Sequence, residues 1–270
     1  MIHPTALIHP GARIGPETTV DPYAVIDEGV SLGARCRIGP HVHLSGHTTI
    51  GDDNRFHSGC VIGDAPQDFK YAGGPTRLRI GNGNTFREHV TVNRSNRLDE
   101  DTVIGDGNFF MAGSHAGHNC RIGNNNILAN GALLAGHVIL ADRAFISGNC
   151  LVHQFCRVGR LALMQGGSAI SKDLPPFCVA RGDNGICGLN GVGLRRSGVD
   201  ADQRLRLKRA YGILFRSGLR RDTALTRVES EFAGDPLVQE LIEFISNSRR
   251  GICADTRGPA RGESPADEEA

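Results

Sequence analysis

Four histidines stand at spacings that could assemble a site for proton transfer. His115 and His118 lie three residues apart, and His137 and His153 follow at longer intervals. A neutral imidazole is the side chain best suited to take a proton from a hydroxyl group near pH 7. Whether these rings come together depends on the elements that carry them, and therefore on the pattern of the surrounding chain.

An apolar residue recurs at every sixth position through most of the sequence. The series runs from residue 2 to residue 62 and from residue 80 to residue 170, and only Asp68 and Gly74 break it. A period of six fits neither an α-helix nor a simple strand, but it is typical of the hexapeptide repeat of a parallel β-helix. We therefore expect three hexapeptides in each 18-residue coil, with the sixth residues pointing into the core.

Two stretches interrupt this repeat. We expect a mainly β domain, a parallel β-helix, over residues 1–178, with loop excursions at 64–79 and 93–101. An excursion from a rigid scaffold is more often functional than not, and this applies most to the longer one. The second excursion keeps the apolar phase through Leu98, and its other residues have the polarity of a surface segment.

A different pattern follows the repeat. The Gly-rich residues 179–198 are expected to form a linker. Residues 199–251 carry apolar residues at helical spacing and the helix start signal Asp235-Pro236, so we expect a small C-terminal α-helical domain. Such a domain would cover the open end of the β-helix. Residues 252–270 are rich in Gly, Pro, Glu and Asp, which is typical of a disordered tail.

Charge and composition exclude several classes of function. The formal net charge is +1 and no nucleic-acid-binding motif is present, so we expect no nucleic-acid partner. No run of eighteen apolar residues occurs, and we expect no membrane insertion. The N-terminal residues lack the basic and apolar regions of a signal peptide, which indicates a cytoplasmic protein with reduced cysteines.

The 18-residue coil predicts that the histidines gather at one edge. His118, Gly136 and Gln154 are spaced by 18 residues, so they should stack in successive coils about 4.8 Å apart. None of the histidines occupies a core position of the repeat. The residues expected at this edge of three coils are His115, His118, Gly136, His137, His153 and Gln154.

This arrangement suits acyl transfer to a hydroxyl group. A neutral histidine could take the hydroxyl proton, and the open backbone N–H of Gly136 could stabilise the oxyanion formed from a thioester carbonyl. No serine or cysteine nucleophile motif is evident, so direct transfer is favoured over a covalent intermediate.

Several longer motifs carry a family resemblance, over about residues 1–250. The chain resembles the acyl-carrier-protein–UDP-N-acetylglucosamine O-acyltransferase family, whose reaction begins lipid A synthesis. The resemblance implies that the β-helix is left-handed. The motifs are Gln67-Asp68-Phe69-Lys70-Tyr71-Ala72-Gly73-Gly74-Pro75-Thr76, His115-Ala116-Gly117-His118, Ile127-Leu128-Ala129-Asn130, Leu134-Ala135-Gly136-His137-Val138, Val152-His153-Gln154-Phe155 and Asp173-Leu174-Pro175-Pro176.

The resemblance also implies roles for individual residues. His118 would be the general base for the sugar 3-hydroxyl and Gly136 N–H the oxyanion donor. Gly166 occupies the position that limits acyl length, and glycine there leaves room for a longer chain. The implied substrate-binding residues are Asp68, Lys70, His115, His137, His153, Gln154, Gly166, Asn190 and Arg196.

The implied partners follow from the same resemblance. The acyl donor is carried on the phosphopantetheine of acyl carrier protein, so the enzyme itself needs no cofactor and no metal. The acceptor is a UDP-amino sugar, and a homotrimer with sites between subunits is expected.

Four positions depart from the family pattern. Asn119 stands where an Asp usually follows the catalytic His, and Asn93 replaces a His. Val192 replaces an acidic residue that contacts the nucleotide, and Ser197 replaces a second Arg. An Asn can hydrogen-bond an imidazole ring, but it cannot stabilise an imidazolium by charge.

Four alternatives remain open. A related N-acyltransferase of the same pathway also places Asn after its His, but it carries an additional N-terminal domain. An acceptor bearing a 3-amino group in place of the 3-hydroxyl is also possible. A zinc hydro-lyase of the carbonic anhydrase type would need three histidines such as His115, His118 and His137 around one metal. A non-catalytic β-helix scaffold would leave the histidine cluster without a role.

Overall fold

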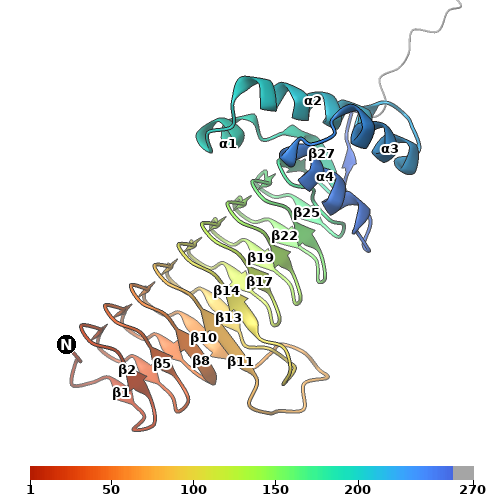
Figure 1. Cartoon of the computed structure of the whole chain (residues 1–270). Helices are drawn as coiled ribbons and strands as arrows, with labels where there is room; N and C mark the ends of the chain where they lie inside the picture. The colour runs from red at the N-terminus through yellow and green to blue at the C-terminus, as the bar shows by residue number, and fades with distance from the viewer. Residues whose placement is uncertain (258–270) are drawn as a thin grey trace, which may run out of the picture.

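The computed structural model describes residues 1–257 of the chain. It consists of a column of stacked coils, with helices gathered at the C-terminal end and a loop that projects from the side of the column between β10 and β11 (Figure 1). This is the parallel β-helix that the six-residue period predicts, because strands from successive coils pair in parallel at a spacing of 18 residues, as in the pairs Leu7↔Val25 and His115↔Leu133.

Three parallel sheets form the faces of the column. The first contains β1 (Leu7–Ile8), β4 (Val25–Ile26), β7 (His43–Leu44), β10 (Val61–Asp64), β13 (Thr91–Asn93), β16 (His115–Ala116), β19 (Leu133–Leu134), β22 (Leu151–Val152) and β25 (Ala169–Ile170). The second contains β2 (Arg13–Ile14), β5 (Ser31–Leu32), β8 (His47–Ile50), β11 (Arg77–Ile80), β14 (Thr102–Ile104), β17 (Arg121–Ile122), β20 (Ile139–Leu140) and β23 (Arg157–Val158).

The third sheet extends beyond the regular coils. It contains β3 (Thr19–Val20), β6 (Arg37–Ile38), β9 (Arg55–Phe56), β12 (Thr85–Phe86), β15 (Phe109–Phe110), β18 (Ile127–Leu128), β21 (Phe145–Ile146), β24 (Leu163–Met164), β26 (Cys178–Arg181), β27 (Gly185–Leu189) and β28 (Ala254–Asp255). All pairs in it are parallel except β26 with β27, which form an antiparallel hairpin.

The core is a single column of side chains from the sixth positions. Ile26, Leu44 and Ile62 are almost completely buried on the first sheet. On the third sheet the Phe86 ring stacks between Phe56 and Phe110 at centroid distances of 4.7 and 4.8 Å. Two residues of the six-residue series do not join them. The prediction of a core position was wrong for Ile2, which is 53% exposed at the start of the column, and for Leu98, which is 59% exposed because its loop leaves the column.

The expected linker at 179–198 was also a wrong prediction. Its residues form β26, β27 and helix α1 (Gly191–Arg196), because the end of the third sheet offers β24 as a partner for a further strand. One glycine of this stretch serves the hairpin turn, where Gly182 and Asn184 have φ values of 62° and 53°. Residues of this kind tolerate the left-handed region.

Three further helices follow α1. They are α2 (Ala201–Arg216), α3 (Arg221–Glu231) and α4 (Pro236–Ser246). The Asp235 carboxylate accepts from the N–H groups of Leu237 and Val238, which caps α4 at the predicted start signal. Leu161 and Phe177 of the last coils are buried in one cluster with apolar residues of α2, α3 and α4, so the helical domain covers this end of the β-helix (Figure 1).

Part of the expected tail is ordered. β28 pairs with β27, and Tyr211 and Arg216 of α2 both donate to the fully buried Asp255 carboxylate. The prediction of disorder was therefore wrong for residues 252–257, and it lies outside the described residues for 258–270. None of the helices in residues 1–257 combines the length and the apolar character needed to span a membrane.

Candidate active site

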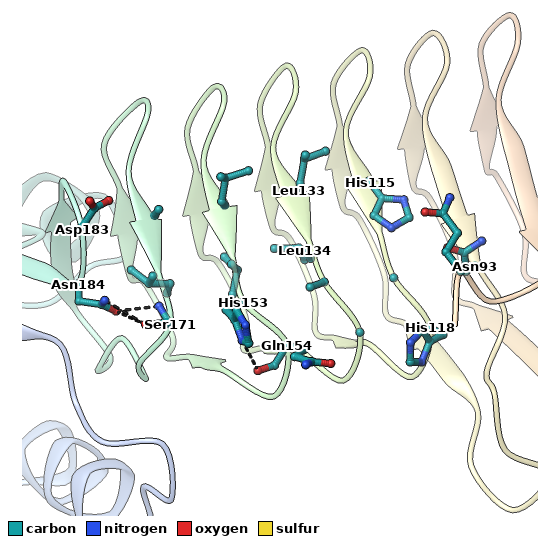
Figure 2. Close-up of a pocket in the computed structure, with 18 residues that line it drawn as sticks. Asn93, His115, His118, Leu133, Leu134, His153, Gln154, Ser171, Asp183 and Asn184 are labelled. Atoms are coloured by element: carbon teal, nitrogen blue, oxygen red, sulfur yellow. Dashed lines mark hydrogen bonds between the residues drawn. The ribbon is translucent and has the colours of Figure 1, made fainter. Parts of the chain in front are cut away.

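A pocket of about 720 Å³ lies beside the first sheet, close to its corner with the second (Figure 2). The turns between these two sheets supply most of its polar groups. Five of the residues predicted from the sequence line it: His115, His118, Gly136, His153 and Gln154. Both loop excursions leave the column at this corner, one between β10 and β11 and the other between β13 and β14. The two excursions and the turn that carries His118 are therefore three successive turns of one corner. We call the corner between the first and second sheets the specialised corner.

His118 and Gly136 lie directly against each other, as the 18-residue spacing predicts. His137 N–H donates to His118 O at 2.8 Å, and Phe155 N–H donates to Gly136 O at 3.1 Å, so the three turns are in register. A Cβ atom on Gly136 would lie 2.6 Å from His118 Nε2, closer than real contacts allow. A larger residue at position 136 would require the ring to move. The Gly136 N–H has no backbone partner within the described residues and remains available to a ligand.

The Asn119 side chain fixes the orientation of His118. His118 Nδ1 lies 2.8 Å from Asn119 Oδ1. The Asn96 backbone N–H also donates to this oxygen at 3.1 Å, so the atom is the acceptor end of the amide. His118 Nδ1 must then carry the hydrogen, which leaves a lone pair on Nε2. In this tautomer of the neutral ring, Nε2 lies next to Gly136, where a general base would need it.

Two nearby rings have pKa values that are lowered toward the neutral form. His115 Nδ1 is 2.7 Å from Thr91 Oγ1, and burial together with the neighbouring His118 lowers the pKa of His115 below 6.5. Burial and His118 also lower the pKa of His137. His137 packs edge-on against the His118 ring at 5.1 Å and stacks on Phe155 at 4.5 Å. It lines an adjoining pocket on the far side of this corner and does not line the main pocket.

Asp68 lies near the site without lining the pocket. Its Oδ1 accepts from Lys70 N–H at 2.9 Å and its Oδ2 from Asn96 Nδ2 at 2.7 Å, and these two hydrogen bonds lower the pKa of Asp68. Because Asn96 also contacts Asn119, Asp68 is linked to the His118 turn through one residue. Its neighbour Gln67 does line the pocket.

Four predicted residues are not brought to the pocket within one chain. Lys70 is exposed on the loop of residues 65–76, and Arg196 is exposed in the last turn of α1. Gly166 lies at the opposite corner of the first sheet, between β24 and β25. The Asn190 amide caps α1, with Oδ1 accepting from Gly193 N–H and Nδ2 donating to Leu161 O.

An apolar wall was missed by the sequence reasoning. Leu133, Leu151 and Ala169 follow His115 at intervals of 18 residues and pair in register along the first sheet. Leu133 and Leu151 are 40% and 49% exposed, although they are large and apolar. The same 18-residue spacing that located His118 would have found them. At the far end of the pocket, Asn184 Oδ1 accepts from Ser171 N–H at 2.7 Å.

The second excursion is more than the surface segment that its polarity predicts. Ser95 is completely buried, and Ser95, Asn96 and Glu100 all contact the Asn119 side chain. No sequence signal marked these residues, because the loop follows no repeat. Asn93, at the end of β13, lines the pocket, and its buried Oδ1 has no hydrogen-bond partner among the described residues.

The zinc alternative requires three ligands around one ion. Within residues 1–257 there is no group of three or more His, Cys, Asp or Glu side chains that could hold a metal ion. The Nδ1 atoms of His115 and His118 are engaged by Thr91 and Asn119.

Comparison with known proteins gives consistent matches over most of the chain. Residues 173–253 match the family model of UDP-N-acetylglucosamine O-acyltransferase domain 2, and 11–46, 29–64 and 101–136 match the bacterial transferase hexapeptide repeat. An acyl-[acyl-carrier-protein]–UDP-N-acetylglucosamine O-acyltransferase of Herminiimonas arsenicoxydans is 44% identical, over 83% of this chain and 92% of its own. A relative of the same name from Anaeromyxobacter sp. (strain Fw109-5) is also 44% identical, over 77% of this chain and 82% of its own.

Solved structures agree with these sequence matches. A UDP-N-acetylglucosamine acyltransferase from Bacteroides fragilis superimposes with a TM-score of 0.90 at 40% identity, covering 93% of this chain and 99% of its own. The enzyme from Campylobacter jejuni gives 0.87 at 38% identity, covering 94% and 99%. The chain therefore belongs to the acyl-[acyl-carrier-protein]–UDP-N-acetylglucosamine O-acyltransferase family.

Proposed function

We propose that this protein transfers a 3-hydroxyacyl chain from acyl carrier protein to the 3-hydroxyl of UDP-N-acetylglucosamine, the first step of lipid A biosynthesis, in the cytoplasm. The names of the relatives support the two substrates. The observation that carries the proposal is the contact between His118 Nε2 and Gly136, because it joins an unprotonated base to a free backbone N–H at one point of the pocket.

The proposed reaction proceeds by direct attack. His118 Nε2 takes the proton of the sugar 3-hydroxyl while its oxygen bonds to the thioester carbonyl carbon. The Gly136 N–H donates to the resulting oxyanion. When the tetrahedral intermediate collapses, the C–S bond breaks and the phosphopantetheine thiolate takes the proton from the His118 imidazolium. The base is then regenerated, and no cofactor or metal of the enzyme takes part.

We propose that the acyl chain lies along the first sheet. Leu133, Leu151 and Ala169 offer a continuous apolar surface that begins beside His115. Gly166 stands at the far edge of this sheet, where an added Cβ would meet nothing closer than Gly148 O at 3.6 Å. A larger residue at 166 would then exclude longer chains, so Gly166→Met should reduce transfer of long acyl groups more than short ones. Equal losses for both lengths would contradict the proposed path.

The remaining predicted residues suit a site shared between subunits of a homotrimer. Lys70 and Arg196 would hold the acyl donor or its carrier protein from a neighbouring copy, and Asn190 would act by fixing the first turn of α1. The exposed Leu133 and Leu151 beside an open pocket support such packing. Light scattering should give the mass of three chains. Mixed oligomers of His118→Ala and Lys70→Ala subunits should recover activity that neither variant has alone.

One assay tests the main proposal. The protein is incubated with 3-hydroxyacyl carrier protein and UDP-N-acetylglucosamine, with His118→Ala as control. General-base catalysis contributes about 100- to 10,000-fold, so the variant should lose that much kcat. The absence of acylated sugar with the wild-type protein, or equal product from the variant, would overturn the proposal.

Transfer to a 3-amino group is the second candidate. The unpartnered Asn93 Oδ1 in the pocket favours it, because an amine supplies N–H donors that this acceptor could use. A competition assay between UDP-N-acetylglucosamine and its 3-amino analogue would distinguish the two. Metal analysis of the active protein tests the zinc alternative, which stoichiometric zinc would favour.

A further inference from the structure

The hydrogen bonds behind His118 continue past Asn119 to a carboxylate. Asn119 Nδ2 donates to Glu100 Oε2 at 3.1 Å and to Ser95 Oγ at 2.7 Å. Asn119 is only 2% exposed, so its amide is shielded from water. One end of this amide accepts from the His118 ring, and the other end donates to the negatively charged group.

The hydrogen-bond partners do not allow the Asn119 side-chain amide to flip. The Asn96 N–H requires an oxygen at the Oδ1 position, and the Glu100 carboxylate requires a donor at the Nδ2 position. The backbone of Asn119 has the left-handed φ of 58°, and its N–H is held by Thr102 Oγ1 at 2.7 Å. Backbone and side chain are therefore both fixed by the loop of residues 94–101 and the strand that follows it.

A charge behind the amide changes what Asn119 can do for the ring. Asn119 alone is neutral, whereas the imidazolium formed during acyl transfer is positive. A carboxylate that accepts from Nδ2 polarises the amide, which makes Oδ1 a stronger acceptor for the Nδ1–H of His118. The negative charge also favours the protonated ring directly.

We propose that Glu100 is a positioning residue for the reaction: through the Asn119 amide, its carboxylate orients His118 with Nε2 toward the pocket and stabilises the imidazolium. This inference rests on the proposed function, in which His118 is the base.

Two arginines near Glu100 interact with it more weakly than Asn119 does. Arg97 Nη1 and Arg121 Nη2 each lie 3.9 Å from a Glu100 oxygen, and their side chains are 64% and 56% exposed, so water screens them. The Glu100 side chain is only 25% exposed. The charged and titratable groups around His118 and Glu100 are Asp68, Arg97, His115, Arg121 and His137.

The first test is Glu100→Gln, which removes the charge and keeps the shape. By analogy with residues that orient metal-bound histidines, we expect kcat to fall about 10-fold, with both KM values within about twofold. The acid limb of the kcat/KM profile should move to lower pH, because an imidazolium without the carboxylate loses its proton more easily. Glu88→Gln is the matched control, a Glu on the same β-helix paired with Arg87 and His57, and it should change neither quantity.

The second test exchanges the amide and the carboxylate. Asn119→Asp alone places two carboxylates at hydrogen-bond distance, so the pair should take up a proton and the rate should fall. In the double variant Glu100→Gln/Asn119→Asp, the carboxylate now at position 119 accepts from the ring and from the amide now at position 100. We expect its kcat to recover to within about threefold of wild type.

These outcomes separate the inference from the proposed function. If Glu100→Gln keeps the wild-type rate and pH profile, Glu100 has no such role, although His118 can still be the base. Glu100→Gln could instead lose rate while the acid limb stays in place and the double variant does not recover. Glu100 would then only stabilise the structure of its loop, and the inference would be overturned. An inactive wild-type protein would instead reject the proposed function.

Discussion

Two corners of the same β-helix use buried asparagines for opposite purposes. At the corner between the second and third sheets, each Oδ1 of a four-residue ladder accepts from the backbone N–H of the next coil. The ladder consists of Asn54, Asn84, Asn108 and Asn126, with distances of 2.8 to 2.9 Å. At the corner between the first and second sheets, the buried Asn119 bonds mainly to other side chains, those of His118, Ser95 and Glu100.

The difference lies in the turn that each amide faces. A regular turn presents backbone groups at a fixed position, so an amide there completes the hydrogen bonding of the coil. Asn119 faces the preceding turn of its own corner, which is expanded into the loop of residues 94–101 and brings side chains instead. The same residue type therefore stabilises the fold at one corner and orients a base at the other.

The largest effect is expected where the specialised corner is tightest. Gly136→Ala would push a methyl group to 2.6 Å from His118 Nε2, so the ring must move. A displacement of about 1 Å at a catalytic group costs about 100-fold in rate, and we expect that loss in kcat. Gly212→Ala in α2 is the matched control, because its Cβ would meet nothing within 4 Å. Equal activity of the two variants would show that His118 does not need its place beside residue 136.

A substitution in the asparagine ladder should lower the stability of the protein and leave its activity unchanged. Asn84→Ala removes the acceptor of the Asn108 N–H and the donor to Gly105 O, both in a buried region. An unsatisfied buried group costs about 1–3 kcal/mol, so the free energy of unfolding should fall by about that much. Urea denaturation measures the change, and the kcat of the folded variant should stay at the wild-type value. A large loss of kcat would mean that the two corners are coupled.

Acid should weaken the fold at the specialised corner. The pKa of the partly buried His115 lies below 6.5, whereas in the unfolded chain it returns to about 6.5. Above that pH both states are neutral, and as the pH falls the unfolded state takes up the proton first, so stability decreases. His115→Gln should therefore lose less thermal stability than wild type between pH 7.5 and 5. His47→Gln, at an exposed ring, should follow the wild-type curve.

The smallest effect is expected at Leu98, which belongs to the six-residue apolar series but lies outside the column. Leu98→Ser changes a side chain that is 59% exposed, so the free energy of unfolding should shift by less than about 0.5 kcal/mol. Ile104 follows it by one repeat and is 1% exposed, and Ile104→Ala should cost about 2–5 kcal/mol. Similar losses in both variants would place Leu98 in the core after all.

The sequence predicts the regular parts of this molecule and not the exceptions to the repeat. The period of six determines which side chains enter the core, and the period of 18 brings His118, Gly136 and Gln154 into one stack. The loop that carries Ser95 and Glu100 follows no period, so its folding back onto Asn119 depends on contacts that a single sequence does not display.

The wrong prediction of a linker at 179–198 has a similar cause. The hairpin of β26 and β27 forms because the third sheet ends there with an open edge, and its glycines alone suggest flexibility. Lys70, Gly166, Asn190 and Arg196 were assigned through resemblance, and one chain does not bring them to the pocket. Their roles remain proposals about the assembled protein.

The way the third sheet ends has a consequence for how the protein behaves at high concentration. A stack of parallel strands with a bare last rung can template growth by another molecule, as in fibrous aggregates. Here the chain turns back through the β26–β27 hairpin and adds β28, which the buried Asp255 clamps to α2. The last strand of this sheet is therefore only two residues long and is held against a helix, and short, covered edges are a common protection against end-to-end assembly.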